Sequence, residues 1–188
     1  MKKILVIGAG RSAVTLIKYL LDNSIANNWL VTVADFSIEL AEKAVANHEN
    51  GKAIFFNVTD EIQRKYEIGN ADIVISMLPA SLHITVAKDC ISLVKNLVTA
   101  SYVSPEIADL DEKAKQAGVL LLNEIGLDPG IDHMSAMQVI DEIKENGGEL
   151  TSFKSFCGGL VHPDYDNNPW NYKFTWNPRN VVLAGQGT

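Results

Sequence analysis

Short apolar segments alternate with helical segments over roughly the first 120 residues of the chain. Residues 4–7 and 73–75 are apolar at every position, which is typical of strands that are buried on both faces. Regular alternation of such strands with helices predicts an α/β fold, a doubly wound parallel sheet with right-handed crossovers. The predicted strands are 3–7, 30–34, 52–56, 73–76, 97–99 and 119–123, and the predicted helices between them are 12–21, 38–48, 61–66, 82–94 and 105–117.

The pattern changes after one further helix. Pro129 suits a first helical position with Asp128 as its N-cap, and Gly147-Gly148 is a signal that ends a helix, so we expect a helix over 129–143. Residues 150–156 alternate loosely, which predicts a half-buried strand. We therefore predict a first domain over 1–147. Residues 148–188 are expected to be the truncated start of an α+β domain, since about 40 residues are too few for a separate core.

Composition and charge exclude several classes of protein. The 188 residues are 47% hydrophobic, too apolar for a disordered chain, and no apolar run reaches the ~20 residues that span a membrane. A net charge of −7 without a basic cluster predicts no nucleic-acid partner and no attachment to anionic lipid. Cys90 and Cys157 make no disulfide framework, so we expect a cytoplasmic protein.

A glycine-rich motif joins the first predicted strand to the first predicted helix. Gly8 permits a tight turn, Gly10 lets a pyrophosphate approach the backbone, and Ala13 is small enough for the helix to pack on the strand. The helix start at Arg11 and Ser12 offers free N–H groups to phosphates. The motif favours a dinucleotide-binding Rossmann domain over a glycine-rich turn of some other α/β protein. Its full sequence is Gly8-Ala9-Gly10-Arg11-Ser12-Ala13.

An acidic residue stands at the end of the second predicted strand. Asp35 comes 22 residues after Ala13, a separation at which a carboxylate accepts hydrogen bonds from the adenosine ribose hydroxyls. A carboxylate there would repel the 2′-phosphate of NADP, and no Arg closely follows Asp35. We therefore expect NAD as the preferred cofactor, with NADP as the alternative. In the other interpretation, Asp35 only begins a loop.

Three later loops follow predicted strands at their carboxyl ends, where open α/β sheets bind ligands. The backbone around Leu78 would line the cofactor, unless residues 76–80 form an ordinary turn. Ser101 and Tyr102 offer hydroxyl groups after the fifth strand. Asp128 lies in the glycine- and proline-rich loop after the sixth strand, where helix capping is its alternative role.

Cysteines and histidines give weaker signals. Cys157 precedes two glycines and is either a substrate contact or a small buried residue, whereas Cys90 lies on a predicted helix and is expected to be structural. His133 is expected to pack or cap rather than to catalyse. No metal site is predicted, because the other histidines lack metal-ligand spacing to one another or to a cysteine; they are His48, His83 and His162.

Five blocks of the sequence carry a family resemblance, namely residues 8–13, 101–105, 123–133, 155–160 and 168–179. The glycine motif alone is generic, but the block Gly-Leu-Asp-Pro-Gly-Ile-Asp-His at 126–133 is specific. Together they resemble the L-glutamate-forming branch of the saccharopine dehydrogenase family. The resemblance covers almost the whole chain in order, and members of that family are substantially longer.

The resemblance implies roles for several residues. Tyr102, Asp128 and Cys157 match positions that line the saccharopine pocket, and Leu78 and Ile125 match positions near the nicotinamide. Ser101 is the second small polar group of the same loop as Tyr102. Asp128 is the candidate general base.

The implied reaction belongs to lysine metabolism. It interconverts saccharopine, an amino-acid substrate, with glutamate and 2-aminoadipate 6-semialdehyde by hydride transfer at a C–N bond. This fragment alone is expected to be inactive, because the resemblance implies that most of the catalytic domain is missing. The alternatives are a related oxidoreductase acting on carboxynorspermidine or a similar amine, and a nucleotide-binding module without catalysis. A homodimer stays open.

Overall fold

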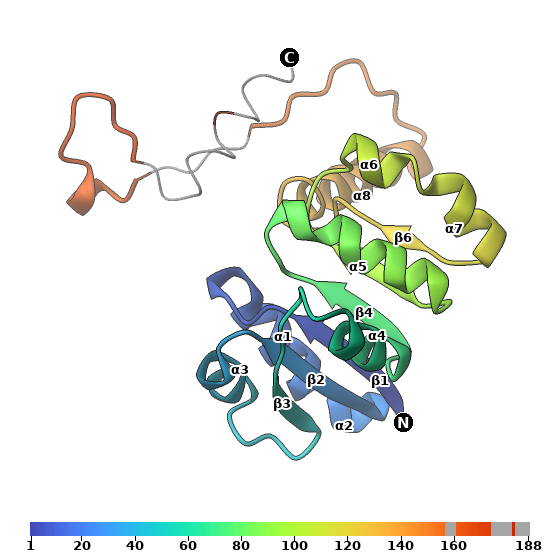
Figure 1. The fold of residues 1–188 in the computed structure, drawn as a ribbon. Coiled ribbons are helices and arrows are strands. Elements are labelled where there is room, and N and C mark those ends of the chain that lie inside the picture. The colour runs from blue at the N-terminus through green and yellow to red at the C-terminus, as the bar shows by residue number, and fades with distance from the viewer. Residues whose placement is uncertain (157–160, 174–181, 183–188) are drawn as a thin grey trace. The chain divides into compact units, whose positions relative to one another are not determined.

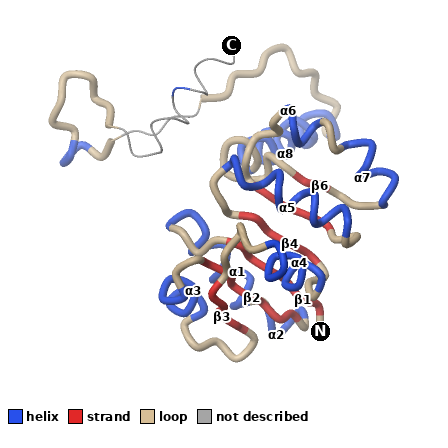
Figure 2. The backbone as a smooth tube through the Cα atoms, in the orientation of Figure 1, coloured by secondary structure: helices blue, strands red, loops and turns tan. Residues whose placement is uncertain are grey.

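The computed structural model describes residues 1–156, 161–173 and 182. The chain divides into two units, Met1–Glu142 and Ile143–Thr188. The first unit holds one six-stranded sheet in the order β3-β2-β1-β4-β5-β6, whose strands are red in Figure 2. Every pair of neighbouring strands in it is parallel. This order is that of a Rossmann domain, so the predicted fold class is confirmed. The strands are β1 (Lys2–Ile7), β2 (Trp29–Asp35), β3 (Gly51–Phe55), β4 (Ile73–Ser76), β5 (Asn96–Thr99) and β6 (Leu121–Leu122).

Helices cover both faces of the sheet (Figure 1). On one face, α1 and α3 bury Ile17 and Ala41 against the strands; on the other, α4, α5 and α6 bury Ile68, Val86 and Ile107. The apolar runs of β1 and β4 serve both cores, which is why they are apolar at every position. The helical segments are η1 (Arg11–Ala13), α1 (Val14–Asp22), α2 (Ser24–Asn27), α3 (Ile38–Val45), α4 (Glu61–Gly69), α5 (Ala80–Ser92), α6 (Pro105–Ala108), α7 (Asp111–Ala117), α8 (Ile131–Glu145) and η2 (Pro163–Tyr165).

Several predicted helices differ from the observed ones at their ends, and for two of them the structure shows a physical cause. The segment 105–117 forms two helices, α6 and α7, because the chain bends at Asp109 and Leu110, where Leu110 is buried in the core. The segment 38–48 ends early, at Val45, because Ala46 has φ 50° and leaves the helical conformation. The prediction also missed the short helix α2.

The N-cap role expected for Asp128 is wrong. Helix α8 begins at Ile131 rather than at Pro129, and the chain is still a loop at Gly130, which has φ 143°. The first turn of α8 is held by Asp132, whose Oδ1 accepts a hydrogen bond of 2.8 Å from the Gly130 N–H. Capping therefore does not account for Asp128.

The second unit is less regular in its described part. The strand predicted over residues 150–156 is absent: these residues have no regular secondary structure and are exposed. Phe153 and Phe156 are 55% and 90% exposed, and among the described residues no strand pairs with the segment to satisfy its backbone groups. The division at Glu142 falls inside α8, and the domain boundary at 147 stays a prediction.

Candidate nucleotide and substrate site

The glycine motif forms a tight turn between β1 and η1, against the end of β4. Gly8 has φ 106°, and a Cβ on it would lie 2.9 Å from the Met77 carbonyl oxygen, so no larger residue fits without movement. Ala13 is fully buried against the core. A Cβ on Gly10, in contrast, would meet no protein atom within 4 Å. The space beside Gly10 is therefore free for a ligand that approaches the backbone.

The Asp35 carboxylate ties the end of β2 to the glycine turn. Its Oδ2 accepts a hydrogen bond of 2.7 Å from the Ala9 N–H, and its Oδ1 accepts one of 2.8 Å from the Ser37 N–H. Both oxygens thus hold backbone that shapes the nucleotide site. These two hydrogen bonds alone explain why an acidic residue stands at position 35, without any contact to a ribose. Arg11 and Ser12, next along the motif, are exposed at the start of the helical segment.

A cavity of about 240 Å³ lies at the carboxyl ends of the strands. Asp35 from β2, Asn57 after β3 and Leu78 after β4 line it, together with the apolar side chains of Phe36 and Phe56. Ligands of open α/β sheets bind at this edge, where the strand order reverses between β1 and β4. The structure therefore brings Asp35 and Leu78, two expected cofactor residues, to one cavity.

The two loops expected to hold a substrate lie side by side. The Ser101 carbonyl oxygen accepts a hydrogen bond of 3.0 Å from the Glu124 N–H, and the Ile125 N–H donates to the Thr99 carbonyl oxygen at 3.3 Å. The Glu124 carboxylate accepts a 3.0 Å hydrogen bond from the Val103 N–H. These three hydrogen bonds thus join the loop after β5 to the loop after β6.

The second of these loops has a backbone path that only small residues allow. The Gly126 N–H donates to the Pro129 carbonyl oxygen at 2.8 Å. A Cβ on Gly130 would lie 2.2 Å from the Gly126 carbonyl oxygen, and one on Gly126 would lie 2.9 Å from the Ala100 side chain. Asp128 is exposed at the turn between them. The loop therefore packs against the residue that precedes Ser101.

Tyr102 and Asp128 are both exposed, Tyr102 at 55%, while Ser101 and Ile125 are half-buried. Four of the expected site residues thus lie on two loops that are joined by hydrogen bonds. Cys157, the remaining expected substrate contact, lies outside the described residues. The roles of these five residues stay predictions.

Three polar residues near the site were missed from the sequence. Arg64 on α4 and Asp89 on α5 form a buried ion pair, 2.5 Å between Nε and Oδ2, and the Arg64 guanidinium also donates to the Val58 carbonyl oxygen. This pair fixes the loop after β3 that lines the cavity. His83, the third, is buried among hydroxyl groups at the ends of β4 and β5. A single charged or imidazole side chain on a helix belongs to no motif with a recognisable spacing, so the sequence does not indicate its partner.

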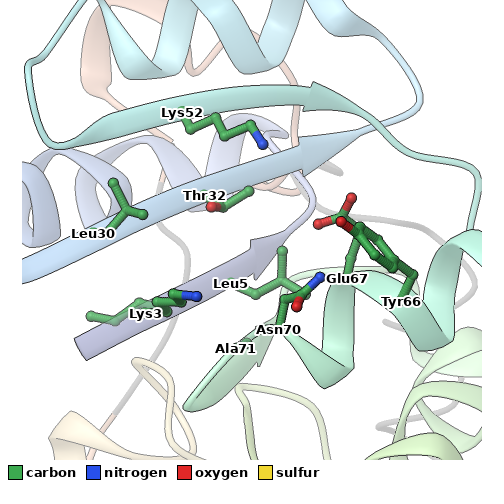
Figure 3. A pocket seen from close by; sticks show the side chains of 10 residues that line it. Lys3, Leu5, Leu30, Thr32, Lys52, Tyr66, Glu67, Asn70 and Ala71 are labelled. Atoms are coloured by element: carbon green, nitrogen blue, oxygen red, sulfur yellow. The ribbon is translucent and has the colours of Figure 1, made fainter. Parts of the chain in front are cut away.

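A second hollow, of about 250 Å³, lies at the opposite end of the sheet (Figure 3). It is lined by Lys3 and Lys52 near the starts of β1 and β3, and by Tyr66, Glu67 and Asn70 from the end of α4. It faces the amino ends of the strands, away from the glycine turn. Since open α/β sheets bind ligands at the carboxyl ends of their strands, the first cavity is the candidate nucleotide site.

We also searched the described residues for metal-binding groups, membrane-spanning helices and a reactive thiol. No group of three or more His, Cys, Asp or Glu side chains among them is arranged to hold a metal ion. No helix in the described part of the chain is long and apolar enough to cross a membrane. Burial raises the pKa of the Cys90 thiol to about 12, so this residue is an inert core side chain at neutral pH.

The strand order and the glycine turn together define a Rossmann domain, the class of fold that binds dinucleotides. Two family models match the chain: the saccharopine dehydrogenase NADP binding domain over residues 4–122, and the saccharopine dehydrogenase C-terminal domain over residues 126–188. The chain therefore belongs to the saccharopine dehydrogenase family, as the sequence blocks indicated.

Curated relatives and solved structures agree with the family assignment. The chain is 42% identical over 183 residues to the NADP(+), L-glutamate-forming saccharopine dehydrogenase of Pyricularia oryzae, covering 97% of this chain and 40% of that protein. It is 47% identical over 156 residues to an alpha-aminoadipic semialdehyde synthase of Arabidopsis thaliana, covering 83% of this chain and 15% of that one. The chain thus spans less than half the length of these relatives.

Among solved structures, the apo L-Glu-forming saccharopine dehydrogenase from Saccharomyces cerevisiae superposes with a TM-score of 0.81 at 40% identity, covering 98% of this chain and 40% of that one. A 3-ketoreductase from Actinomadura kijaniata, at 18% identity and a TM-score of 0.58, covers 77% of this chain and 42% of that one. The second similarity shows the Rossmann fold alone.

The expectation of NAD as preferred cofactor is wrong. The matching family model is that of an NADP binding domain, and the fungal relatives are named as NADP(+) enzymes. The expectation rested on Asp35 as a free carboxylate facing the ribose, yet both of its oxygens hold backbone N–H groups of Ala9 and Ser37.

Proposed function

We propose that this chain is the NADP-binding domain, with the beginning of the substrate domain, of an L-glutamate-forming saccharopine dehydrogenase. The observation that carries the proposal is the 42% identity over 97% of the chain to relatives with that name. The joined loops after β5 and β6, at the same edge of the sheet as the nucleotide cavity, support it.

The residues at this edge fit a dinucleotide. Gly10 leaves its outer side open for the pyrophosphate, and the start of the helical segment at Arg11 and Ser12 supplies N–H groups. Arg11 is the cation that we assign to the 2′-phosphate, because the hydrogen bond from Ala9 to Asp35 holds the glycine turn against the end of β2, where the ribose binds. Leu78 and Ile125 belong to the nicotinamide side of the site.

The oxidative reaction breaks a C–H bond at the carbon that becomes the aldehyde, and the cofactor supplies the acceptor for that hydride. The secondary amine loses its proton, and water then adds to the imine carbon and releases glutamate and 2-aminoadipate 6-semialdehyde. Asp128 is our candidate for the base, since it is exposed on the loop beside the substrate and capping does not occupy it. Tyr102 and Ser101 orient the substrate through their hydroxyl groups.

Steady-state assays of the intact protein test the proposal. NADPH formation on addition of saccharopine, with glutamate as a product, is the expected result. Turnover of carboxynorspermidine but not of saccharopine would assign the protein to the related amine oxidoreductases instead. NADP binding without turnover of either amine would indicate a nucleotide-binding module.

Two further properties belong to this proposal. A cytoplasmic location is supported by the free, buried thiol of Cys90, which suits a reducing compartment. A homodimer is the assembly we propose for the intact protein, and its mass in solution by light scattering checks this.

A further inference from the structure

His83 on α5 uses both nitrogens of its ring inside the protein. Its Nδ1 lies 2.8 Å from Ser76 Oγ, and its Nε2 lies 2.7 Å from Ser101 Oγ and 3.2 Å from Thr99 Oγ1. The histidine is only 3% exposed, and Ser76 and Thr99 are almost fully buried. A buried imidazole is costly without such partners, whereas an apolar side chain would pack there at no such cost. A role for the polar ring beyond packing is therefore indicated.

The three hydroxyl groups come from the two strand ends that flank the site. Ser76 is the last residue of β4, and Thr99 pairs with it as the last residue of β5. Ser76 is followed by the loop that carries Leu78, on the cofactor side, and Thr99 by the loop that carries Ser101, on the substrate side. The imidazole thus connects the cofactor loop to the substrate loop from inside the protein.

Ser101 is the member of this cluster that reaches towards solvent. Its side chain is held by His83, and its carbonyl oxygen accepts the Glu124 N–H at 3.0 Å. Two residues on, the Val103 N–H is held by the Glu124 carboxylate. Tyr102 lies between these two fixed residues and is 55% exposed. The direction of its phenol therefore depends on how firmly the residues on either side are held.

We propose that His83 is a positioning residue for the amino-acid substrate: by holding Ser101 Oγ, it fixes the loop that presents the hydroxyl groups of Ser101 and Tyr102. This inference rests on the proposed function. Burial lowers the pKa of His83, so the ring is neutral at pH 7, and one nitrogen donates while the other accepts. A neutral ring therefore satisfies Ser76 on one side and Ser101 on the other at the same time.

Two amide variants separate the two ends of the ring. The amide of His83→Gln reaches the position of Nε2 and retains a partner for Ser101, whereas that of His83→Asn reaches only the position of Nδ1 and Ser76. In the intact protein, we expect His83→Asn to raise the KM for saccharopine about tenfold, the effect of one lost orienting hydrogen bond. The Kd for NADP should stay unchanged, and His83→Gln should restore most of the affinity for saccharopine.

A matched histidine and a second substitution complete the design. His48→Asn, the same change at a histidine whose Nδ1 accepts only the Asn50 N–H outside the site, should leave KM unchanged. In a Ser101→Ala background, His83→Asn should raise KM no further, because the partner is already gone. Equal KM values for unsubstituted protein, Asn variant and Gln variant would overturn the proposal. If both variants lost the same thermal stability and kept the KM of the unsubstituted protein, His83 would have only a structural role, and the proposal would also be overturned.

A readout that needs no turnover keeps this inference separate from the proposed function. In protein labelled with ¹⁵N-histidine, the Nε2 resonance that disappears in His83→Gln should shift in Ser101→Ala, and the resonances of the other histidines should not. An unchanged Nε2 resonance would contradict the contact on which the positioning role depends. Absence of saccharopine turnover by the unsubstituted protein, with the resonance shifted as expected, would contradict the proposed function alone.

Discussion

Gly8 and Gly10 belong to the same turn, but the physical reason for a glycine differs between the two positions. Gly8 is required by the protein itself, since it has φ 106° and a Cβ would lie 2.9 Å from the Met77 carbonyl oxygen. Gly10 has an ordinary backbone conformation and no protein atom near its missing Cβ. The first glycine therefore serves the fold, and we assign the second to the ligand.

Alanine substitutions separate these two reasons. Gly10→Ala should weaken NADP binding about tenfold, because the new methyl group occupies the approach of the pyrophosphate, and should leave the Tm unchanged. Gly8→Ala should lower the free energy of unfolding by about 1 kcal/mol or more. Isothermal titration and thermal melts measure the two effects. A Gly10→Ala variant that melts early while binding NADP normally would contradict the placement of the cofactor.

Arg11 is the residue to which we assign cofactor preference. Arg11→Gln removes the cation that we assign to the 2′-phosphate and keeps a polar side chain, so NADP affinity should fall roughly 10- to 100-fold, the range of a charged hydrogen bond. The affinity for NAD, which lacks that phosphate, should not change. Fluorescence titrations with both reduced cofactors check this, with Lys18→Gln on the adjoining helix α1 as the control. Equal losses for NADPH and NADH would rule out the assignment.

At the scale of elements, sequence pattern predicted the regular parts of the sheet well. The strand at 73–76 has the observed bounds, and the strand at 3–7 lacks only Lys2, since apolar runs bounded by turn residues leave few alternatives. The break between α6 and α7 was missed because it depends on tertiary burial of Leu110. The start of α8 was misplaced because the loop from Gly126 to Gly130 closes on itself and packs against Ala100, a contact between residues 26 positions apart that the local pattern does not reveal.

The same distinction applies to the site. Gly8, Gly10 and Ala13 form a contiguous motif and are visible in the sequence. The cluster around His83 joins α5 to two strand ends through side-chain hydroxyls, and the residues it connects are 7 and 18 positions from the histidine. Such partners are defined only once the crossover from β4 to β5 is folded.

The pairing of α4 with α5 depends on a buried ion pair, Arg64 with Asp89, whose side chains are 8% and 9% exposed. Asp89→Ala leaves the guanidinium buried without its partner and should cost about 3–5 kcal/mol of unfolding free energy. The double variant Arg64→Met/Asp89→Ala should recover part of that loss. Urea denaturation measures both, with the exposed pair of Lys65 and Glu61 as a control whose loss should cost much less, because water screens exposed charges. Equal costs for the buried and the exposed pair would contradict this account.

At the scale of the whole molecule, His83 makes stability depend on pH. Burial lowers its pKa below the usual 6.5, so the unfolded chain binds a proton in a pH range where the folded chain does not. The stabilisation that comes from the neutral, buried ring of His83 is fully present above pH 6.5. It is lost progressively as the pH falls below that value towards the pKa of His83 in the folded protein. The free energy of unfolding should thus be lower at pH 5.5 than at pH 7.5, with a smaller difference in His83→Asn. If the change in unfolding free energy between the two pH values were the same in His83→Asn as in His48→Asn, His83 would not be the source of the pH dependence.

The most direct test of the proposed function follows the hydride itself. Saccharopine that carries two deuterium atoms at the carbon that becomes the aldehyde is incubated with the intact protein and NADP, and the reduced cofactor and both amino-acid products are analysed by mass spectrometry. We expect one deuterium in the reduced cofactor, the other on the aldehyde carbon of 2-aminoadipate 6-semialdehyde, and none in glutamate. A reduced cofactor without deuterium, or one formed without glutamate, would contradict the proposed function.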